Sequence, residues 1–370
     1  MRRRVLAIAF AAATGLAAAD TPRARSEEPR PYEVVAELSV DPTSSNSSLG
    51  MSSRWIILAS TGGAQFIQRE ASDNSADWTR LDLVPPPGGT ASFGRVVTID
   101  GSGYVVGDPG ARAAWVYDFG MYQVNKRKLV PSDTLVSEGF ASTVAMCSHS
   151  VAVGAPASNA VHVFGDRPGV IRAPNADAEF GRALSCDGST LMISATGVVY
   201  AYQVDNKLQW ALVRTLRAPD AAAGDGFGAA VSTIPGPTSA VGAPFHGAGA
   251  VYVFTDGGET VKLDAPPGVS EFGSSIDFAA GPGEPAESLV VGAPGGSSAV
   301  FTYALSAGKW SLDSSTAAPP ASKRFGREVA TSGKFDALVG AEGKAFVMRR
   351  SVSITLSTGG EPAFGSCRSK

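Results

Sequence analysis

The chain has 370 residues, 43 of them Gly and 24 Pro, and its formal net charge is −3 at pH 7. This length exceeds one ordinary core of about 100 to 200 residues unless the fold is a repeat array or a closed β architecture. A mildly acidic surface without basic clusters argues against nucleic acid and anionic lipid as partners. Short runs of β-branched and aromatic residues between turn formers, and no apolar period of 3.6 after the first twenty residues, predict many short strands and little helix.

The first 19 residues have the pattern of a cleavable signal peptide. Arg2, Arg3 and Arg4 precede an apolar run from Val5 to Ala19 that ends in small residues. The alternative is a membrane anchor, but this run is shorter than the roughly 20 residues of a membrane span. Cleavage removes three Arg and no acid, which changes the formal charge from −3 to −6. We therefore expect a secreted protein, extracellular or periplasmic, with no membrane insertion after signal cleavage.

The residues after the signal divide into three parts. Residues 20–31 are rich in Pro, Arg and Glu and predict a disordered leader. The folded domain is expected to span residues 32–365, beginning with a strand at 32–40, and to be followed by a polar tail at 366–370. Asn46 lies in an N-glycosylation sequon, which matters only in a host that glycosylates secreted proteins.

A Phe-Gly pair recurs along the folded domain. Phe140-Ala141 is a near match, and Leu49-Gly50 takes the position of a first copy. The steps between copies are 40 to 53 residues with a mean of 46, so seven starts predict seven copies of one supersecondary unit. The five plain pairs begin at Phe93, Phe180, Phe227, Phe272 and Phe325.

Two further landmarks recur in step with the Phe-Gly pair. One is a strand ending in Val-Gly-Ala-Pro, as at Val241 to Pro244, and the other is an alternating strand such as Val251 to Phe254. Strands that are apolar on both faces need cover on both faces, which a blade between two neighbouring blades has. A more polar fourth strand fits an exposed outer edge. The pattern predicts an all-β fold, a seven-bladed β-propeller of four-stranded antiparallel blades.

These landmarks resemble the FG-GAP repeats of integrin α chains and of many exported microbial proteins. The resemblance covers about residues 32–365 and is closest in the repeats that begin at Phe227 and Phe272. It implies a propeller whose turns between the second and third strands, and between one blade and the next, share the ligand-binding face. Many members carry a D-x-D-x-D-G calcium cage between their first two strands. Here those loops supply at most one or two carboxylates each, so we expect no cofactor and no structural calcium.

Two structural questions stay open at this level. Either residues 32–40 or residues 351–357 supply the fourth strand of the last blade, and the N-terminal segment is the preferred one. Cys147 and Cys186 follow equivalent Phe positions by seven and six residues, in adjacent repeats. They form either a disulfide bond or two buried thiols.

The sequence has none of the common catalytic motifs, such as G-x-S-x-G, H-E-x-x-H, C-x-x-C or a P-loop. Its three His are His149, His162 and His246. His162 alternates within a strand, which favours a packed or edge position, and His149 has no recognisable catalytic partner. His246 lies in the long turn between the second and third strands of the fifth repeat.

The candidate ligand-binding residues lie in turns of the expected ligand face, because loops carry most of the function of β scaffolds. The alternative is that each is a solvated turn residue without a ligand. The turns between second and third strands offer Asp108, Arg112, Asn159, Phe245 and His246. The turns from one blade to the next offer four carboxylates, a possible site for a cation or a basic partner, in Glu138, Glu179, Asp225 and Glu271.

The sequence thus predicts a non-catalytic interaction module for adhesion or scaffolding, which binds an extracellular protein or glycan. One alternative is a propeller glycan hydrolase or lyase, since propellers host hydrolases with a carboxylate pair. A converging Arg cluster with a Tyr/Glu pair on one face would favour that enzyme, whereas the sequence shows only scattered Arg. The other alternative is a structural extracellular component.

The small number of carboxylates in the loops between first and second strands leads to a prediction. Addition of a calcium chelator should leave the unfolding temperature unchanged, because no cage of several oxygen ligands is there to hold the ion. Thermal unfolding followed by circular dichroism with and without chelator measures this. A fall of several degrees would show that calcium supports the fold.

Overall fold

The computed structural model is built almost entirely from strands. Residues 1–26, which include the predicted signal, lie outside the described part, as do Asn46, His149 and the tail at 366–370. None of the described residues forms a helix long and apolar enough to cross a membrane. The chain divides into a large unit, Arg30–Ser351, and a second unit made of Met1–Pro29 and Val352–Lys370. The described residues are 27–39, 48–60, 62–69, 78–83, 85–119, 124–132, 138–147, 150–175, 177–205, 209–236, 238–255, 259–280, 288–333 and 336–354.

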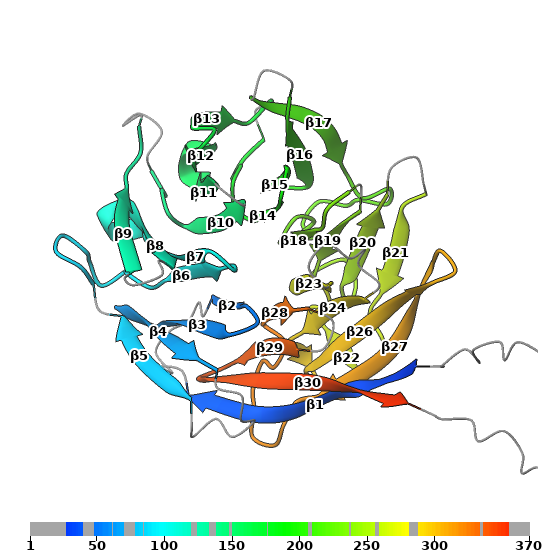
Figure 1. Ribbon diagram of the computed structural model, residues 1–370. Coiled ribbons are helices and arrows are strands. Elements are labelled where there is room, and N and C mark those ends of the chain that lie inside the picture. The colour runs from blue at the N-terminus through cyan, green and yellow to red at the C-terminus, as the bar shows by residue number, and fades with distance from the viewer. Residues whose placement is uncertain are drawn as a thin grey trace, which may run out of the picture. The chain divides into compact units, whose positions relative to one another are not determined.

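Seven four-stranded antiparallel sheets, the blades, form the large unit, as the sequence predicted. In Figure 1 the first strand of each blade lies toward the middle of the ring and the fourth toward its outside. Blade one contains β2 (Leu49–Met51), β3 (Trp55–Ser60), β4 (Gly63–Gln68) and β5 (Thr79–Leu83). Blade two contains β6 (Val96–Ile99), β7 (Gly103–Asp108), β8 (Ala113–Phe119) and β9 (Val124–Leu129). Blade three contains β10 (Thr143–Cys147), β11 (Ser150–Ala155), β12 (Ala160–Gly165) and β13 (Gly169–Arg172).

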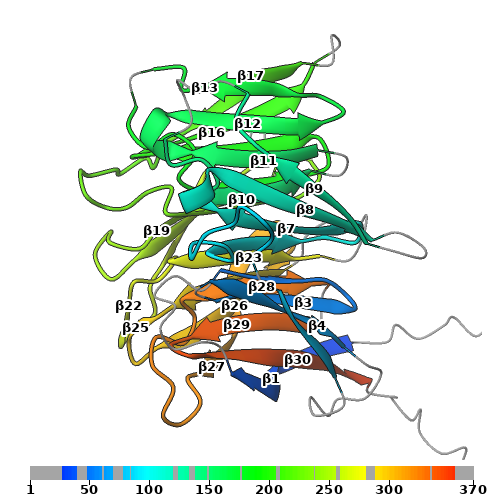
Figure 2. The same cartoon turned by 90° about the vertical axis from the view of Figure 1, so that its left-hand side faces the viewer.

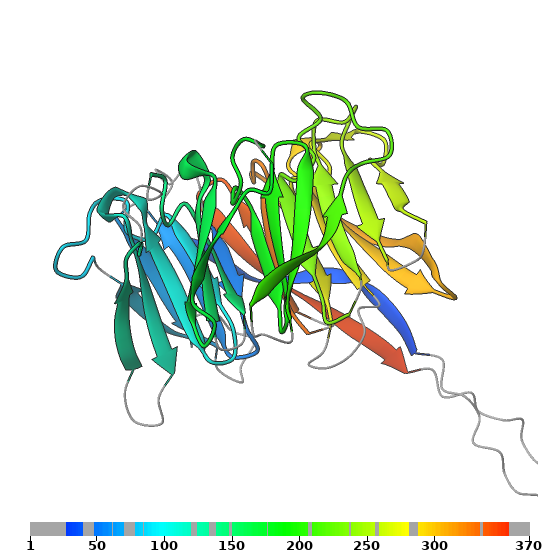
Figure 3. The same ribbon diagram turned by 90° about the horizontal axis from the view of Figure 1, so that it is seen from above.

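The remaining four blades follow in chain order, and Figure 3 shows the blades edge-on with their strands side by side. Blade four contains β14 (Leu184–Asp187), β15 (Thr190–Ala195), β16 (Val198–Val204) and β17 (Trp210–Leu216). Blade five contains β18 (Ala230–Thr233), β19 (Ser239–Ala243), β20 (Ala250–Phe254) and β21 (Val261–Asp264). Blade six contains β23 (Ser275–Ala279), β24 (Ser288–Ala293), β26 (Ala299–Ser306) and β27 (Lys309–Ala317). Blade seven contains β28 (Glu328–Ser332), β29 (Asp336–Ala341), β30 (Lys344–Ile354) and β1 (Glu27–Ser39).

Three short elements lie in the turns between strands. The 3-10 turns η2 (Pro109–Ala111) and η4 (Pro156–Ser158) join the second and third strands of blades two and three. A small sheet of β22 (Val269–Ser270) and β25 (Gly295–Gly296) accompanies blade six. In Figure 2 this small sheet lies at the side of the molecule, beyond the ends of the neighbouring blade strands.

The N-terminal strand closes the ring, as preferred from the sequence. Strand β1 is the outermost strand of blade seven, next to β30. Tyr32 and Leu38 of β1 are buried, and the Thr316 hydroxyl of blade six donates a hydrogen bond to the Tyr32 carbonyl over 3.0 Å. Two boundaries differ from the expectation. Strand β1 begins at Glu27, so the end of the expected leader is strand, and residues 351–354 extend the third strand β30 instead of forming a fourth.

Each Phe-Gly pair connects one blade to the next. The six landmark Phe rings are at most 2% exposed. The Gly after the Phe has a positive φ, 88° at Gly228 and 87° at Gly273, which only Gly adopts freely. A Cβ placed on Gly242 of the Val-Gly-Ala-Pro run would lie 2.0 Å from the carbonyl oxygen of Gly273 in the next blade. The two Gly landmarks therefore exist because the backbones of adjacent blades touch there.

The hydrophobic core is divided among seven clusters, one at each interface between adjacent blades. The cluster between blades four and five, for example, joins Met192 and Val199 of one blade to Phe227 and Tyr252 of the other. Each of the other six clusters likewise combines buried side chains from two adjacent blades. This division explains why both faces of the inner strands are apolar.

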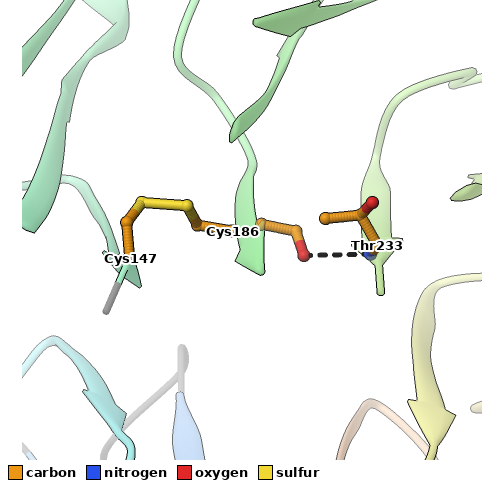
Figure 4. The surroundings of a disulfide bond; sticks show 4 residues. Cys147, Cys186 and Thr233 are labelled. Carbon is orange, nitrogen blue, oxygen red and sulfur yellow. Dashed lines mark hydrogen bonds between the residues drawn. A yellow bond between two sulfur atoms is a disulfide. The ribbon is translucent and has the colours of Figure 1, made fainter. Parts of the chain in front are cut away.

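A disulfide bond joins the innermost strands of blades three and four. Cys147 at the end of β10 and Cys186 of β14 are linked, with their Cα atoms 5.2 Å apart (Figure 4). A hydrogen bond joins the innermost strands of the next two blades. The Thr233 amide of blade five donates it to the Ser185 hydroxyl of blade four over 3.2 Å. Of the two alternatives for these Cys residues, the structure has the disulfide bond.

The buried Phe-Gly pairs lead to a prediction on stability. Phe227→Ala should lower the free energy of unfolding by about 3 to 5 kcal/mol, since it leaves a cavity between blades four and five. The matched control is Phe245→Ala in the same blade, whose ring is 62% exposed and should cost little. Urea unfolding measures both variants. Equal losses would show that the landmark Phe does not hold the blades together.

Candidate functional site

Two of the predicted binding residues serve the architecture of their turns. Asp108 is fully buried; its carboxylate accepts hydrogen bonds from the Thr90 amide over 2.7 Å, from the Thr90 hydroxyl and from the Ala111 amide. Asn159 ends η4 in the left-handed conformation, and its side-chain oxygen accepts a hydrogen bond of 3.1 Å from the Phe180 amide of the next blade. Both side chains therefore hold turns in place, which the sequence pattern could not distinguish from ligand binding.

Arg112 occupies the turn position equivalent to Asn159 in blade two. It ends η2 with a φ of 46° and is exposed. Its left-handed backbone conformation fixes the place of this side chain on the turn.

The four carboxylates ahead of the Phe landmarks do not act together. Glu179 contacts Arg182 over 3.3 Å, and Glu271 contacts Arg324 over 2.8 Å. The backbone carbonyl of the exposed Glu138 accepts a hydrogen bond from Ser158, and Asp225 contacts His246. Among the residues that the structure describes, no three His, Cys, Asp or Glu side chains gather closely enough to hold a metal ion. Three of these side chains thus have separate partners, and the one at Glu271 links its turn to the next blade-to-blade turn.

Blade five brings three predicted residues together: Asp225, Phe245 and His246. The Asp225 carboxylate lies 2.9 Å from Nδ1 of His246, and it also accepts a 2.6 Å hydrogen bond from the Ala222 amide. The Phe245 amide donates to the Asp225 carbonyl over 3.0 Å. The blade-to-blade turn and the turn between β19 and β20 are therefore locked to each other.

Three further residues, which the sequence reasoning missed, complete this cluster. The Lys262 ammonium lies 2.9 Å from Nε2 of His246 and donates a 2.7 Å hydrogen bond to Asp220. The Tyr252 hydroxyl donates to the other oxygen of Asp220 over 2.6 Å. An ammonium group has no acceptor, so Nε2 accepts and the His246 proton sits on Nδ1, facing Asp225. The pairing of the third and fourth strands could have indicated part of this cluster, because Tyr252 of β20 lies directly opposite Lys262 of β21.

The charges in this blade-five cluster, defined as Asp220, Asp225, His246, Tyr252 and Lys262, stabilise one another. The Lys262 ammonium, together with the Tyr252 hydroxyl, lowers the pKa of Asp220 to about 2. The hydrogen bond with His246 lowers the pKa of Asp225, and Asp220 raises the pKa of Lys262. Burial, followed by the Asp220 hydrogen bond, raises the pKa of Tyr252. Asp220, Asp225 and Lys262 thus keep their charges at neutral pH.

Phe245 projects from the turn beside this cluster. Its ring is 62% exposed, the largest exposure among the big apolar side chains of the described residues. The ring lies over Gly226, where a Cβ would come within 2.9 Å of it. A rigid turn therefore presents an exposed aromatic ring next to fixed charged groups.

Comparison with known proteins supports the repeat and the fold. Residues 210–254 match the model of the FG-GAP repeat, a span that runs from β17 to β20 and includes the blade-five turn. No curated protein sequence matches the chain significantly.

Three solved structures share the fold over most of the chain. One is from a mitotic checkpoint complex, with 16% identity, a TM-score of 0.61, and coverage of 94% of this chain and 99% of the other. Another is virginiamycin B lyase from Staphylococcus aureus, with 10% identity, a TM-score of 0.61, and coverage of 86% and 99%. An inactive variant of that lyase with quinupristin has 12% identity, a TM-score of 0.58 and the same coverage. At these identities the likeness concerns the fold alone. The chain is a seven-bladed β-propeller that carries an FG-GAP repeat in its fourth and fifth blades.

The electrostatics of the blade-five cluster lead to a prediction. Lys262→Met should raise the Asp220 pKa from about 2 toward the ordinary 3.8, because the largest cause of the shift is removed. The lowered pKa means that charged Asp220 stabilises the fold fully above about pH 4, and that this stabilisation is lost as pH falls toward 2. Carboxyl-carbon NMR titration of Asp220 measures the change. Lys126→Met, a charge removed from blade two, is the control, and an unshifted Asp220 in the Lys262 variant would refute the network.

Proposed function

We propose that this propeller is an exported, non-catalytic interaction module, which binds an extracellular protein or glycan for adhesion or scaffolding. The observation that carries the proposal is the exposed Phe245 ring beside the fixed charges of the blade-five cluster. Aromatic rings on rigid turns bind partners at a low cost in conformational entropy, and they stack on both sugar faces and apolar side chains. The bound conformation is already present before the partner arrives.

Two features support export. The first 19 residues have the pattern of a signal peptide. The disulfide bond between Cys147 and Cys186 points the same way, because such bonds persist in oxidising compartments and are rare in the cytosol.

The binding surface in this proposal combines three turn residues of the face that the sequence singled out. Phe245 supplies an apolar anchor, His246 holds the turn that carries this ring through its contact with Asp225, and Arg112 adds a positive charge. Glu138 and Glu179 lie exposed in turns between blades and would set the preference for basic partners. Such charges affect the rate and specificity of association more than its strength.

The proposal predicts the outcome of a substitution series. Replacing Phe245, His246 and Arg112 together by Ala should weaken partner binding at least about tenfold, since aromatic and Arg anchors carry most of the energy of such interfaces. Binding is measured on a glycan array and by capture from the native extracellular milieu, with the wild-type chain beside the variant.

The control for this series is Leu312→Ala, which removes a side chain that is 50% exposed on the outer strand β27. Its binding should equal that of the wild type. A triple variant that keeps its unfolding temperature and also keeps its partners would refute the proposed surface.

A further inference from the structure

A cavity of about 260 Å³ lies between blades two and three. Blade two lines it with Ser102, in the loop between β6 and β7, and with residues of β8 and β9. Blade three lines it with residues at the end of β10, at the start of β11 and at the end of β12. A loop between the first and second strands lies at the end of the blade opposite to the turn between the second and third strands. The cavity therefore reaches the end of the blades opposite to the turn position that Phe245 occupies in blade five.

Much of the lining of this cavity is apolar. Val116 and Leu129 of blade two and Val151 of blade three are buried members of the hydrophobic cluster between these blades. Met146 and Phe164 of blade three pack against the same cluster and are half-buried. The cavity thus lies against the hydrophobic cluster, and an apolar group that enters it is removed from water.

Among the described residues, three charged side chains also line the cavity. Side chains alternate between two faces along a strand, so Asp118 of β8 shares the face of Val116, toward blade three. By the same alternation, Arg127 of β9 shares the face of Leu129. Nε of Arg127 donates a 3.3 Å hydrogen bond to the Asp118 carboxylate, in an ion pair that is partly exposed. The third charged residue is Asp166, directly after β12.

The Asp118–Arg127 ion pair leaves one net negative charge in the lining, that of Asp166. Asp166 is exposed, and no hydrogen bond or ion pair with any described residue engages its carboxylate. The Ser102 hydroxyl is already engaged, because it donates a hydrogen bond of 2.7 Å to Asp100. Asp166 is therefore the charged group of this lining that a ligand can engage, and a ligand that balances it carries one positive charge.

We propose that this cavity binds a small organic amine, with its ammonium group at Asp166 and its apolar body against Met146 and Phe164. An ammonium donates charge-assisted hydrogen bonds to a carboxylate, and it is attracted to a neighbouring aromatic ring. The volume is near the lower end of the range of roughly 300 to 1,000 Å³ for small-molecule sites, so the ligand is small. The site is independent of the proposed surface around Phe245, because it involves other blades and the opposite ends of their strands.

Isothermal titration calorimetry of the full chain tests the proposal, with phenethylamine as the probe. Phenylethanol has a hydroxyl in place of the ammonium, and ethanolamine has the ammonium without the apolar body. We expect phenethylamine to bind at millimolar concentration, and each of the other two to bind at least about tenfold more weakly. Nα-acetyl-lysine methylamide carries an ammonium on a peptide unit, and it should bind more weakly than the free amine.

Substitutions at the exposed Asp166 test the site with little risk to the fold. Asp166→Asn should weaken phenethylamine binding about tenfold, because it removes the charge that pairs with the ammonium. Asp166→Lys should abolish this binding and lead instead to binding of phenylacetate, which has a carboxylate on the same apolar body. Arg127→Gln should strengthen phenethylamine binding up to about fivefold, because it removes a like charge from the lining.

The matched control is Asp82→Asn, which removes an exposed carboxylate from the outer strand β5 of blade one. It should bind phenethylamine as the wild type does. Equal weakening by Asp82→Asn and Asp166→Asn would overturn the proposal, because it indicates a general charge effect.

Four further results would overturn the proposal. The first is a wild-type chain that does not bind phenethylamine at millimolar concentration. The second is equal affinity for phenethylamine and phenylethanol. The third is tighter binding of the lysine derivative, which would assign the cavity to a side chain of a partner protein. The fourth is unchanged phenethylamine binding by an Asp166→Lys variant that keeps the unfolding temperature of the wild type.

Discussion

The close contact between the backbones of adjacent blades is the constraint on which this propeller depends. At three interfaces, a Gly of one blade lies against the carbonyl of the Gly that follows the landmark Phe of the next, at Gly154 with Gly181, Gly242 with Gly273, and Gly292 with Gly326. A side chain on Gly154, Gly242 or Gly292 would push those blades apart, and the buried Phe beside each contact fills the remaining space. The same geometry sets the start of each innermost strand. It therefore also places the residues after the Phe-Gly pair around one central cavity.

Closure of the ring pairs strands from the two ends of the folded domain, whereas the other blades pair strands that are close in sequence. Six blades each take their four strands from one stretch of the chain, whereas blade seven takes its outer strand from the beginning of the chain. Burial of Tyr32 and Leu38 holds this strand, together with the hydrogen bond from Thr316. The disulfide bond adds a covalent link between blades three and four, where it shortens the free chain by a loop of 39 residues. By the loop-entropy estimate such a link is worth about 4 kcal/mol.

The Phe245 surface and the central cavity between the blades lie in different parts of the same repeat. The Phe245 surface lies on variable turns, whose residues need only close the connection between strands and can otherwise change. The central cavity of about 360 Å³ between the blades is lined by the position directly after each Phe-Gly or Phe-Ala pair, where three repeats have Arg and three have Ser or Ala. Architecture determines where these positions lie, and the residue type at each decides what they bind. A scaffold of this kind separates folding from recognition.

The sequence by itself determined the architecture, because a landmark repeated in phase seven times reports the same local contacts seven times. It also placed Phe245, His246 and Asp225 on one blade, since all three lie in the turns of a single repeat. The sequence could not show that Asp108 is a buried turn cap, because a carboxylate in a turn looks the same whether it faces solvent or the backbone. Nor could it show that Lys262 reaches His246, or that three scattered Arg line one cavity. Those relations depend on strand register and on the closure of the ring, which bring together residues from different strands and blades, and only the tertiary structure decides them.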